Sequence, residues 1–332
     1  MRNKHGAPSL RPSSSASGLG VRGGSVISSN DARTGRDRSL EGYPVPGTPD
    51  FPEVEHRRWV FRHPVLIRVT HWINAVCLAV LLMSGLQIFN AHPALYWGQV
   101  SRFDKPLLVV EATGNDDPRG ITTVLGRRFD TTGVLGLSTS QGESAERAFP
   151  AWITLPSDQN LATGRRWHFL FAWLLVLNGL AYLAYGIATG QLRARLIPSR
   201  GQLRRFGTSV REHMLLRFPQ GEEAKRYNVI QKLTYLAVIL VLLPVQVLAG
   251  LTMSPGATAI APWLLDLFGG RQSARTVHFV VANLLVAFVV VHVALVVLSG
   301  LWNNMRGMLT GWFVIARRTR VLPRGTSAEP AE

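Results

Sequence analysis

The chain has 332 residues, of which 47% are hydrophobic and 17% are charged, and its formal net charge is +16. In a soluble protein this charge would suggest a nucleic-acid partner. Here the basic residues flank long apolar runs, which is typical of a membrane protein, so we expect membrane lipid and no nucleic acid around the chain. The single cysteine, Cys77, excludes an intrachain disulfide and the Cys-x-x-Cys-His motif of covalent haem attachment.

Residues 1–58 are rich in Ser, Gly, Arg and Pro and show no apolar periodicity, which predicts a disordered basic tail. They contain no apolar core of signal-peptide length, so we expect no cleaved secretory leader. Residues 319–332 are expected to form a short C-terminal tail. The domain is expected to cover residues 59–318.

Four apolar runs in this domain are long enough to cross a bilayer as helices. The runs cover residues 65–89, 167–189, 229–253 and 277–301. The first begins after Pro64, which suits the first turn of a helix, and the third contains Pro244, where we expect a kink. The sequence therefore predicts an all-α fold, an integral membrane four-helix bundle.

Basic residues are distributed unevenly among the connecting segments. They accumulate before the first run, between the second and third runs, and after the fourth. Residues 90–164 balance their bases with acidic residues, and residues 254–270 contain no Lys or Arg. Because segments rich in Lys and Arg remain in the cytoplasm, we expect both termini to be cytoplasmic and residues 90–164 to face outward.

Two histidines, His278 and His292, interrupt the fourth run fourteen positions apart. On a helix this spacing is about 21 Å, and the two side chains leave within about 40° of each other. Ionisable residues inside a membrane are costly and usually mark function. His71 lies near the cytoplasmic start of the first run, and His168 near the outer start of the second. Depth therefore pairs His168 with His278 and His71 with His292.

Four histidines at two matched depths predict axial ligands for two haems b, one between each pair. For any single intramembrane histidine, the alternative is a hydrogen bond to a neighbouring helix or contact with the membrane surface. The remaining histidines lie outside the apolar runs. Of these, His63 and His92 are candidates to contact a substrate or a partner.

An arginine precedes three of these histidines by three positions, namely Arg68, Arg165 and Arg275. This spacing places both side chains on one helix face, with the arginine one turn nearer the membrane surface. A guanidinium can bind a haem propionate in a forked pair, so we expect these arginines to bind haem. The alternative is that they extend to lipid headgroups. Small residues that would let a haem approach the helix backbones are Gly85, Gly179, Gly250 and Gly300.

The outward segment, residues 90–164, is far longer than a connection between adjacent helices requires. Its centre, residues 111–147, is polar and rich in Gly and Thr, and aromatic residues lie near the span boundaries at both ends. Two interpretations remain open. The segment caps the outer haem and docks a soluble partner, or its aromatic residues form a belt at the membrane surface.

Four stretches carry a recognisable pattern: RVTHWINAVCLAVLLMSGLQIF, GRRWHFLFAWLLVLNGLAY, YNVIQKLTYLAVILVLLPVQVLAGL and FGGRQSARTVHFVVANLLVAFVVVHV. With them the chain resembles, over about residues 60–315, the dihaem b-type cytochromes that anchor periplasmic oxidoreductases. That group includes the cytochrome b subunits of Ni/Fe-hydrogenases and of thiosulfate reductases. The stretches HPALYWG and GRRWHFLFAW are most similar to the thiosulfate-reductase branch.

This resemblance implies that His71, His168, His278 and His292 bind two haems b in the inner (plasma) membrane of a bacterium. It implies electron exchange between the quinone pool and an extracytoplasmic oxidoreductase, for which a molybdopterin-dependent enzyme is one candidate. The chain itself would be an electron-transfer subunit of a quinone-linked respiratory complex, without catalytic residues of its own. The substrate of thiosulfate reductase is not implied, because substrates in this group follow the partner.

Electron transfer has two alternatives. A transporter or proton channel could use intramembrane histidines as a proton relay. However, the four runs contain no acidic residue, and the two halves of the chain show no repeat. A membrane di-metal oxygenase would need clustered histidines and carboxylates, whereas the histidines in the four runs are isolated.

Overall fold

The computed structural model describes residues 53–114, 117–140, 142–204, 207, 211 and 229–320. Most of the predicted N-terminal tail, residues 321–332 and most of the connection between the second and third spans lie outside this part of the chain. Four helices within it are long and apolar enough to cross a membrane. This confirms the predicted four-helix membrane fold.

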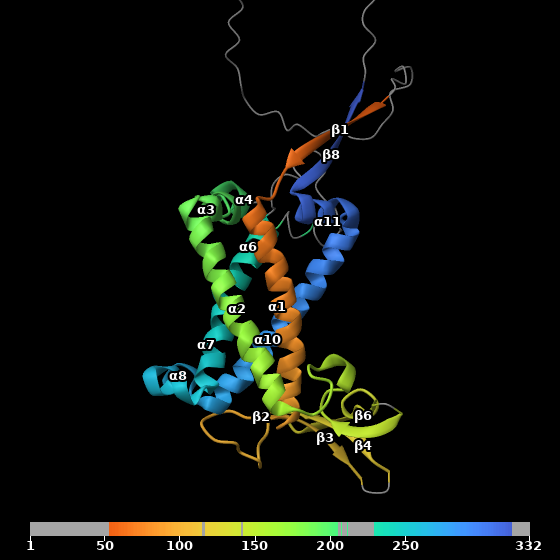
Figure 1. Ribbon diagram of the computed structural model, residues 1–332, viewed down its shortest axis with the longest axis vertical. Coiled ribbons are helices and arrows are strands. Elements are labelled where there is room, and N and C mark those ends of the chain that lie inside the picture. The colour runs from red at the N-terminus through yellow and green to blue at the C-terminus, as the bar shows by residue number, and fades with distance from the viewer. Residues whose placement is uncertain are drawn as a thin grey trace, which may run out of the picture. The chain divides into compact units, whose positions relative to one another are not determined.

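The four spans are the continuous elements α1 (Val65–Asn90), α2 (Leu161–Ala188), α6–η3–α7 (Val229–Ala237, Val238–Leu242 and Leu243–Met253) and α10 (Arg271–Leu298). Close backbone packing joins α1 to α2 and α7 to α10. Successive spans run in opposite directions, so α1 begins at one end of the molecule and α10 at the other (Figure 1). The first histidines of these two helices, His71 and His278, therefore lie near opposite ends.

Two spans begin earlier than the apolar runs predict. Helix α2 begins at Leu161 because the Asn160 side chain caps it, accepting a hydrogen bond of 3.0 Å from the backbone N–H of Thr163. Helix α10 begins at Arg271, after Gly270 with φ of +120°. A Cβ at residue 270 would lie 2.6 Å from the carbonyl oxygen of Gly98, so only glycine permits this close approach.

The third span contains a turn of π-helix, η3, immediately before α7. Pro244 lies at the start of α7 and has no N–H, so the carbonyl of Leu240 loses its usual helical partner. A π turn accommodates this loss within a continuous span. The helix is therefore irregular at the place where the sequence predicts a kink.

One end of the helices carries a two-stranded antiparallel ribbon, in which β1 (Glu53–Phe61) pairs with β8 (Trp312–Arg320). We call this the ribbon end. The short helices α3 (Gln191–Leu196), α4 (Arg200–Arg204) and α11 (Leu301–Thr310) lie at the same end (Figure 1). Residues 53–58, expected within a disordered tail, instead belong to β1, and β8 extends two residues past the expected domain boundary at 318.

The opposite end carries the long segment between α1 and α2, and we call it the sheet end (Figure 1). This segment forms a four-stranded antiparallel sheet and a separate hairpin, whereas the sequence indicated only a mixed polar loop. The sheet has the order β2 (Ala94–Leu95), β3 (Leu108–Thr113), β4 (Arg119–Val124) and β5 (Arg127–Asp130). The hairpin consists of β6 (Gly136–Ser140) and β7 (Glu143–Arg147).

The sheet-end segment is packed onto the membrane helices. Its buried core joins Leu95, Val110 and Ala148 to Phe89 of α1, and Phe279 of α10 packs against it. Arg147 is also buried, and it donates hydrogen bonds of 2.9 Å to the side-chain oxygens of Gln87 in α1 and Thr154. The short helices η1 (Ala151–Ile153), α8 (Pro255–Ile260) and α9 (Trp263–Phe268) complete this end.

Candidate functional site

The structure brings the four intramembrane histidines together as two pairs. The ring centres of His168 in α2 and His278 in α10 lie 6.2 Å apart. The ring centres of His71 in α1 and His292 in α10 lie 6.3 Å apart. These are the pairs that depth along the helices predicts, one near the sheet end and one near the ribbon end.

His168 is held by α1. Its Nδ1 lies 3.1 Å from the hydroxyl oxygen of Ser84, and the carbonyl of Leu81 is a further hydrogen-bond partner. The Ser84 hydroxyl lies 2.6 Å from the carbonyl of Val80, to which it donates, so its oxygen can accept from Nδ1. A Cβ at Gly85 would lie 3.3 Å from the His168 ring. The ring therefore fits against the backbone of α1, and Nε2 remains as a ligand atom.

His278 is held by α7 in the same way. Its Nδ1 lies 2.9 Å from the carbonyl oxygen of Gln246, and a Cβ at Gly250 would lie 3.3 Å from the ring. In both cases a backbone carbonyl lies four residues before the glycine that makes room for the imidazole. Two helices thus present the same arrangement to the two rings of one pair.

The side chain of Gln246 contacts His278. Its amide nitrogen is 3.1 Å from Nε2 of His278, the atom left over for a ligand. Its amide oxygen is buried and has no hydrogen-bond partner among the described residues. Iron binding at Nε2 of His278 would therefore require the Gln246 amide to move away from that nitrogen.

The pair near the ribbon end has aromatic surroundings. His71 lies against Trp72, with ring centres 5.4 Å apart, and His292 stacks on Phe288 at 5.8 Å. Tyr235 of α6 contacts the edge of Phe288. Aromatic side chains provide the dry surface that a flat macrocycle needs.

The three arginines expected at haem propionates have other contacts in this structure. Arg68 donates to the carbonyl of Leu309 in α11, and Arg275 donates to the carbonyl of His92. Arg165 is exposed and lies over the ring of Phe169, 5.6 Å from its centre. Each guanidinium has N–H groups beyond those used in these contacts, because arginine carries five.

Of the four candidate glycines, Gly85 and Gly250 lie against histidine rings, whereas a Cβ at Gly179 or Gly300 would meet nothing within 4 Å. Gly300 instead separates α10 from α11, with φ of +107°. Sequence reasoning missed Ser84 and Gln246. The signal available in the sequence was a polar residue within an apolar run. Ser84 lies next to Gly85, and Gln246 lies one turn before Gly250.

The histidine pairs fit a haem better than a bare metal ion. Among the described residues, no group of three or more His, Cys, Asp or Glu could hold a metal ion. A haem needs only two axial ligands from the protein, since its ring supplies the other nitrogens. A metal bound at about 2 Å by one nitrogen of each ring would separate the ring centres by about 6 Å, close to both observed spacings.

The family model described as prokaryotic cytochrome b561 matches residues 62–311. The chain belongs to this family. It is therefore a multi-pass membrane b-type cytochrome that binds haem b and transfers electrons, as the resemblance in the sequence implied.

A curated relative supports the same family. The chain is 30% identical over 236 residues to a protein of Azospira oryzae named as a protein-methionine-sulfoxide reductase subunit, YedZ1. The match covers 71% of this chain and 90% of that protein. No solved structure matches the chain.

Proposed function

We propose that this cytochrome binds two haems b and carries electrons between the quinone pool and an oxidoreductase outside the cytoplasmic membrane. The observation that carries the proposal is the pair of histidine–histidine spacings, 6.2 and 6.3 Å, at two depths along the shared helix α10. Haem b supplies the one-electron chemistry. The chain supplies the ligands His168 and His278 near the sheet end, and His71 and His292 near the ribbon end.

We further propose that the ribbon end is cytoplasmic and the sheet end faces outward across the inner membrane of a bacterium. The ribbon end carries many basic residues in its connections, including Arg57, Arg58, Arg62, Arg193, Arg200 and Arg204. Under the positive-inside rule, these residues support a cytoplasmic position for both termini. The folded sheet-end segment is then available to a partner on the other side.

The relative from Azospira oryzae supports an oxidoreductase partner, because it is named as a subunit of a reductase. We propose a reductase of the same general kind for this chain, and molybdopterin-dependent enzymes are among the candidates. The sheet-end strands are the proposed docking surface. Strand β5 is exposed along its whole length at the edge of the sheet, and an open edge can pair with another chain.

The proposal predicts two non-covalent haems b for each chain. The purified protein should give a b-type pyridine haemochrome spectrum at two haems per polypeptide, and acidified acetone should extract all of the haem. A value near one haem, or haem that stays attached to the polypeptide, would contradict the two-haem arrangement. A protein without haem would reopen the transporter or proton-channel alternative.

The arginines are proposed to stabilise reduced haem through their positive charge and propionate contacts. Arg275→Ala should lower the midpoint potential of the sheet-end haem while the haem is retained, because a nearby cation stabilises an added electron. The expected change is on the order of 1 kcal/mol, or tens of millivolts for one electron. Redox titration of membranes measures it.

Arg165→Ala should shift the same haem less, because the Arg165 side chain is exposed and its charge is screened by water. Arg275→Lys is the matched control, since it keeps the charge and changes only the geometry. If the Ala variant titrates like the wild type, Arg275 serves only to anchor the carbonyl of His92.

A further inference from the structure

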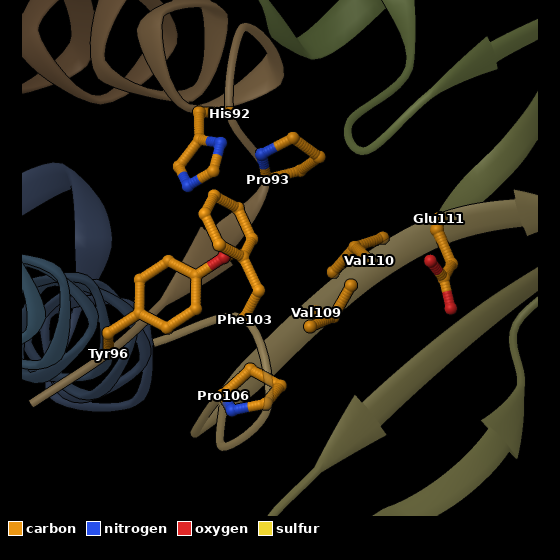
Figure 2. A pocket seen from close by; sticks show the side chains of 9 residues that line it. His92, Pro93, Tyr96, Phe103, Pro106, Val109, Val110 and Glu111 are labelled. Atoms are coloured by element: carbon orange, nitrogen blue, oxygen red, sulfur yellow. The ribbon is translucent and has the colours of Figure 1, made fainter. Parts of the chain in front are cut away.

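A cavity of about 310 Å³ lies at the sheet end, directly after α1 (Figure 2). Its lining includes three aromatic rings in mutual contact. The ring of His92 stacks on Tyr96, with centres 5.7 Å apart, and Phe103 meets both rings edge-on at 6.2 and 5.7 Å. Pro93, Pro106, Val109 and Val110 add apolar walls (Figure 2). Its volume is at the lower end of the range of small-molecule sites.

One polar atom of the lining residues is buried without a partner. Nε2 of His92 is buried and has no hydrogen-bond partner among the described residues. Burial, and then the nearby charge of Arg275, lower the pKa of His92. The imidazole is therefore neutral at neutral pH, and one of its nitrogens can accept a proton. The charged residue of the lining, Glu111, is exposed and acidic, which disfavours an anionic ligand.

The cavity is fastened to the helix that carries His278. Thr276 donates a hydrogen bond of 2.6 Å to the carbonyl of Tyr96, and Arg275 donates to the carbonyl of His92. The hydroxyl of Ser273 accepts a hydrogen bond of 2.7 Å from the N–H of Gly98. The cavity wall and the first turns of α10 therefore form one hydrogen-bonded unit, beside the sheet-end histidine pair.

The cavity also has an apolar approach. Trp97, Val100 and Phe103 are 59%, 66% and 75% exposed, and Phe103 lines the cavity. This segment follows the end of α1 and so lies at the level where the span leaves the membrane. Large apolar side chains exposed at that level contact lipid. They provide a route by which a lipid-soluble molecule reaches the cavity without crossing water.

We propose that this cavity binds the headgroup of a quinol, with its ring against Tyr96 and Phe103 and one hydroxyl on Nε2 of His92. The inference rests on the proposed function. It adds the side of the membrane on which quinol is oxidised and the residues that bind the quinol. The quinol loses two electrons and two protons and becomes a quinone. The electrons pass one at a time to the two ferric haems b, which are reduced. One proton passes first to His92 and the other to water at the open side of the cavity.

The test measures quinol oxidation and quinone binding separately. Purified protein is mixed in a stopped-flow instrument with decylubiquinol, or with menadiol, and haem reduction is followed by visible absorption. His92→Phe keeps an aromatic ring and removes the proton acceptor. It should slow haem reduction by at least about tenfold, because a positioned base typically contributes 10²–10⁴-fold. Reduction by dithionite should give the wild-type spectrum.

Binding is measured by quenching of the fluorescence of 2-heptyl-4-hydroxyquinoline N-oxide, a quinol analogue. Phe103→Ala should weaken binding several-fold, because it removes one wall of the cavity. Trp152→Ala is the matched control: Trp152 is an exposed aromatic residue of the same segment that is not among the residues lining the cavity, and its loss should change neither measurement.

The outcomes separate this inference from the proposed function. If quinol reduces the wild type and His92→Phe equally fast, the quinol site lies elsewhere and the inference fails, while the quinone link stands. If neither quinol reduces the wild-type haems, the quinone link of the proposed function fails as well. The site is supported if His92→Phe slows haem reduction and Phe103→Ala weakens binding, while Trp152→Ala changes neither measurement.

Discussion

Replacing His168 or His278 with alanine should remove one haem, and replacing His71 or His292 should remove the other. The ring spacings of 6.2 and 6.3 Å join these residues two by two, so each variant deprives one haem of an axial ligand. Each variant should keep one haem of two. Pyridine haemochrome assays give the number, and low-temperature difference spectra show which haem remains.

The four variants should therefore fall into two spectral groups. Asn283→Ala is a matched control, since Asn283 lies between the two histidines of α10, is exposed, and bonds the carbonyl of Phe279 in its own helix. Gly250→Val should weaken binding of the haem that His278→Ala removes, because the added side chain displaces the His278 ring. A side chain at residue 179 meets open space, so Gly179→Val should not weaken haem binding. If the His71 and His168 variants lost the same haem, the proposed pairs would be wrong.

Removing the strands of the sheet-end segment should block transfer to the partner while both haems remain. Strands β3 and β7 lie against each other, so residues 114–146 can be replaced by a short Gly/Ser linker. Arg147 must be kept, because its hydrogen bond to Gln87 joins the segment to α1. Both haem spectra and quinol-driven reduction should be unchanged, since the ligands and the residues lining the cavity are retained.

Electron transfer onward is measured by reoxidation of reduced haem on addition of the host's periplasmic fraction with methionine sulfoxide. The shortened protein should be reoxidised at least about tenfold more slowly, since the docking surface has been removed. If the rate of haem reoxidation is unchanged, the strands are only a spacer and the partner docks elsewhere. If the wild type is not reoxidised either, the proposed partner class is wrong.

The membrane part of the fold could be predicted because its signals are strong. Long apolar runs have few structural solutions in a bilayer, and α6–η3–α7 covers the predicted residues 229–253. The histidine pairs could be predicted because successive spans run in opposite directions, so position along the chain fixes depth. Boundaries were less accurate where polar residues, such as Asn160, extend a helix beyond its apolar run.

The sheet-end strands were missed because their pattern is weak. Residues 119–130 contain a short β-branched run, residues 121–124, but no regular alternation of apolar and polar residues. Leu125 and Gly126, which follow this run, both have positive φ, as a two-residue hairpin turn requires. A leucine at such a position is uncommon, so the turn gave no usual signal. Strand β1 was missed because its partner β8 is at the far end of the chain.

The details around the histidines could not be predicted from their spacing. Ser84 and Gln246 approach His168 and His278 through the rotation of α1 and α7 about their axes. That rotation is set by packing between helices, which a single apolar run does not specify. The sequence made His92 a candidate to contact a substrate or a partner, but its cavity depends on strands that the sequence did not reveal.

The sharing of α10 by both histidine pairs has an electrical consequence. The fourteen residues between His278 and His292 span about 21 Å of a hydrocarbon layer of about 30 Å. With the two proposed haems and the proposed orientation, an electron moving inward from one haem to the other would cross about two-thirds of the voltage drop. A full crossing is worth about 2.3 kcal/mol per 100 mV, so each 100 mV of inside-negative voltage disfavours this step about tenfold. While the membrane carries this voltage, the second electron of a quinol would thus remain near the outer surface. The inner haem would become reduced as the voltage falls.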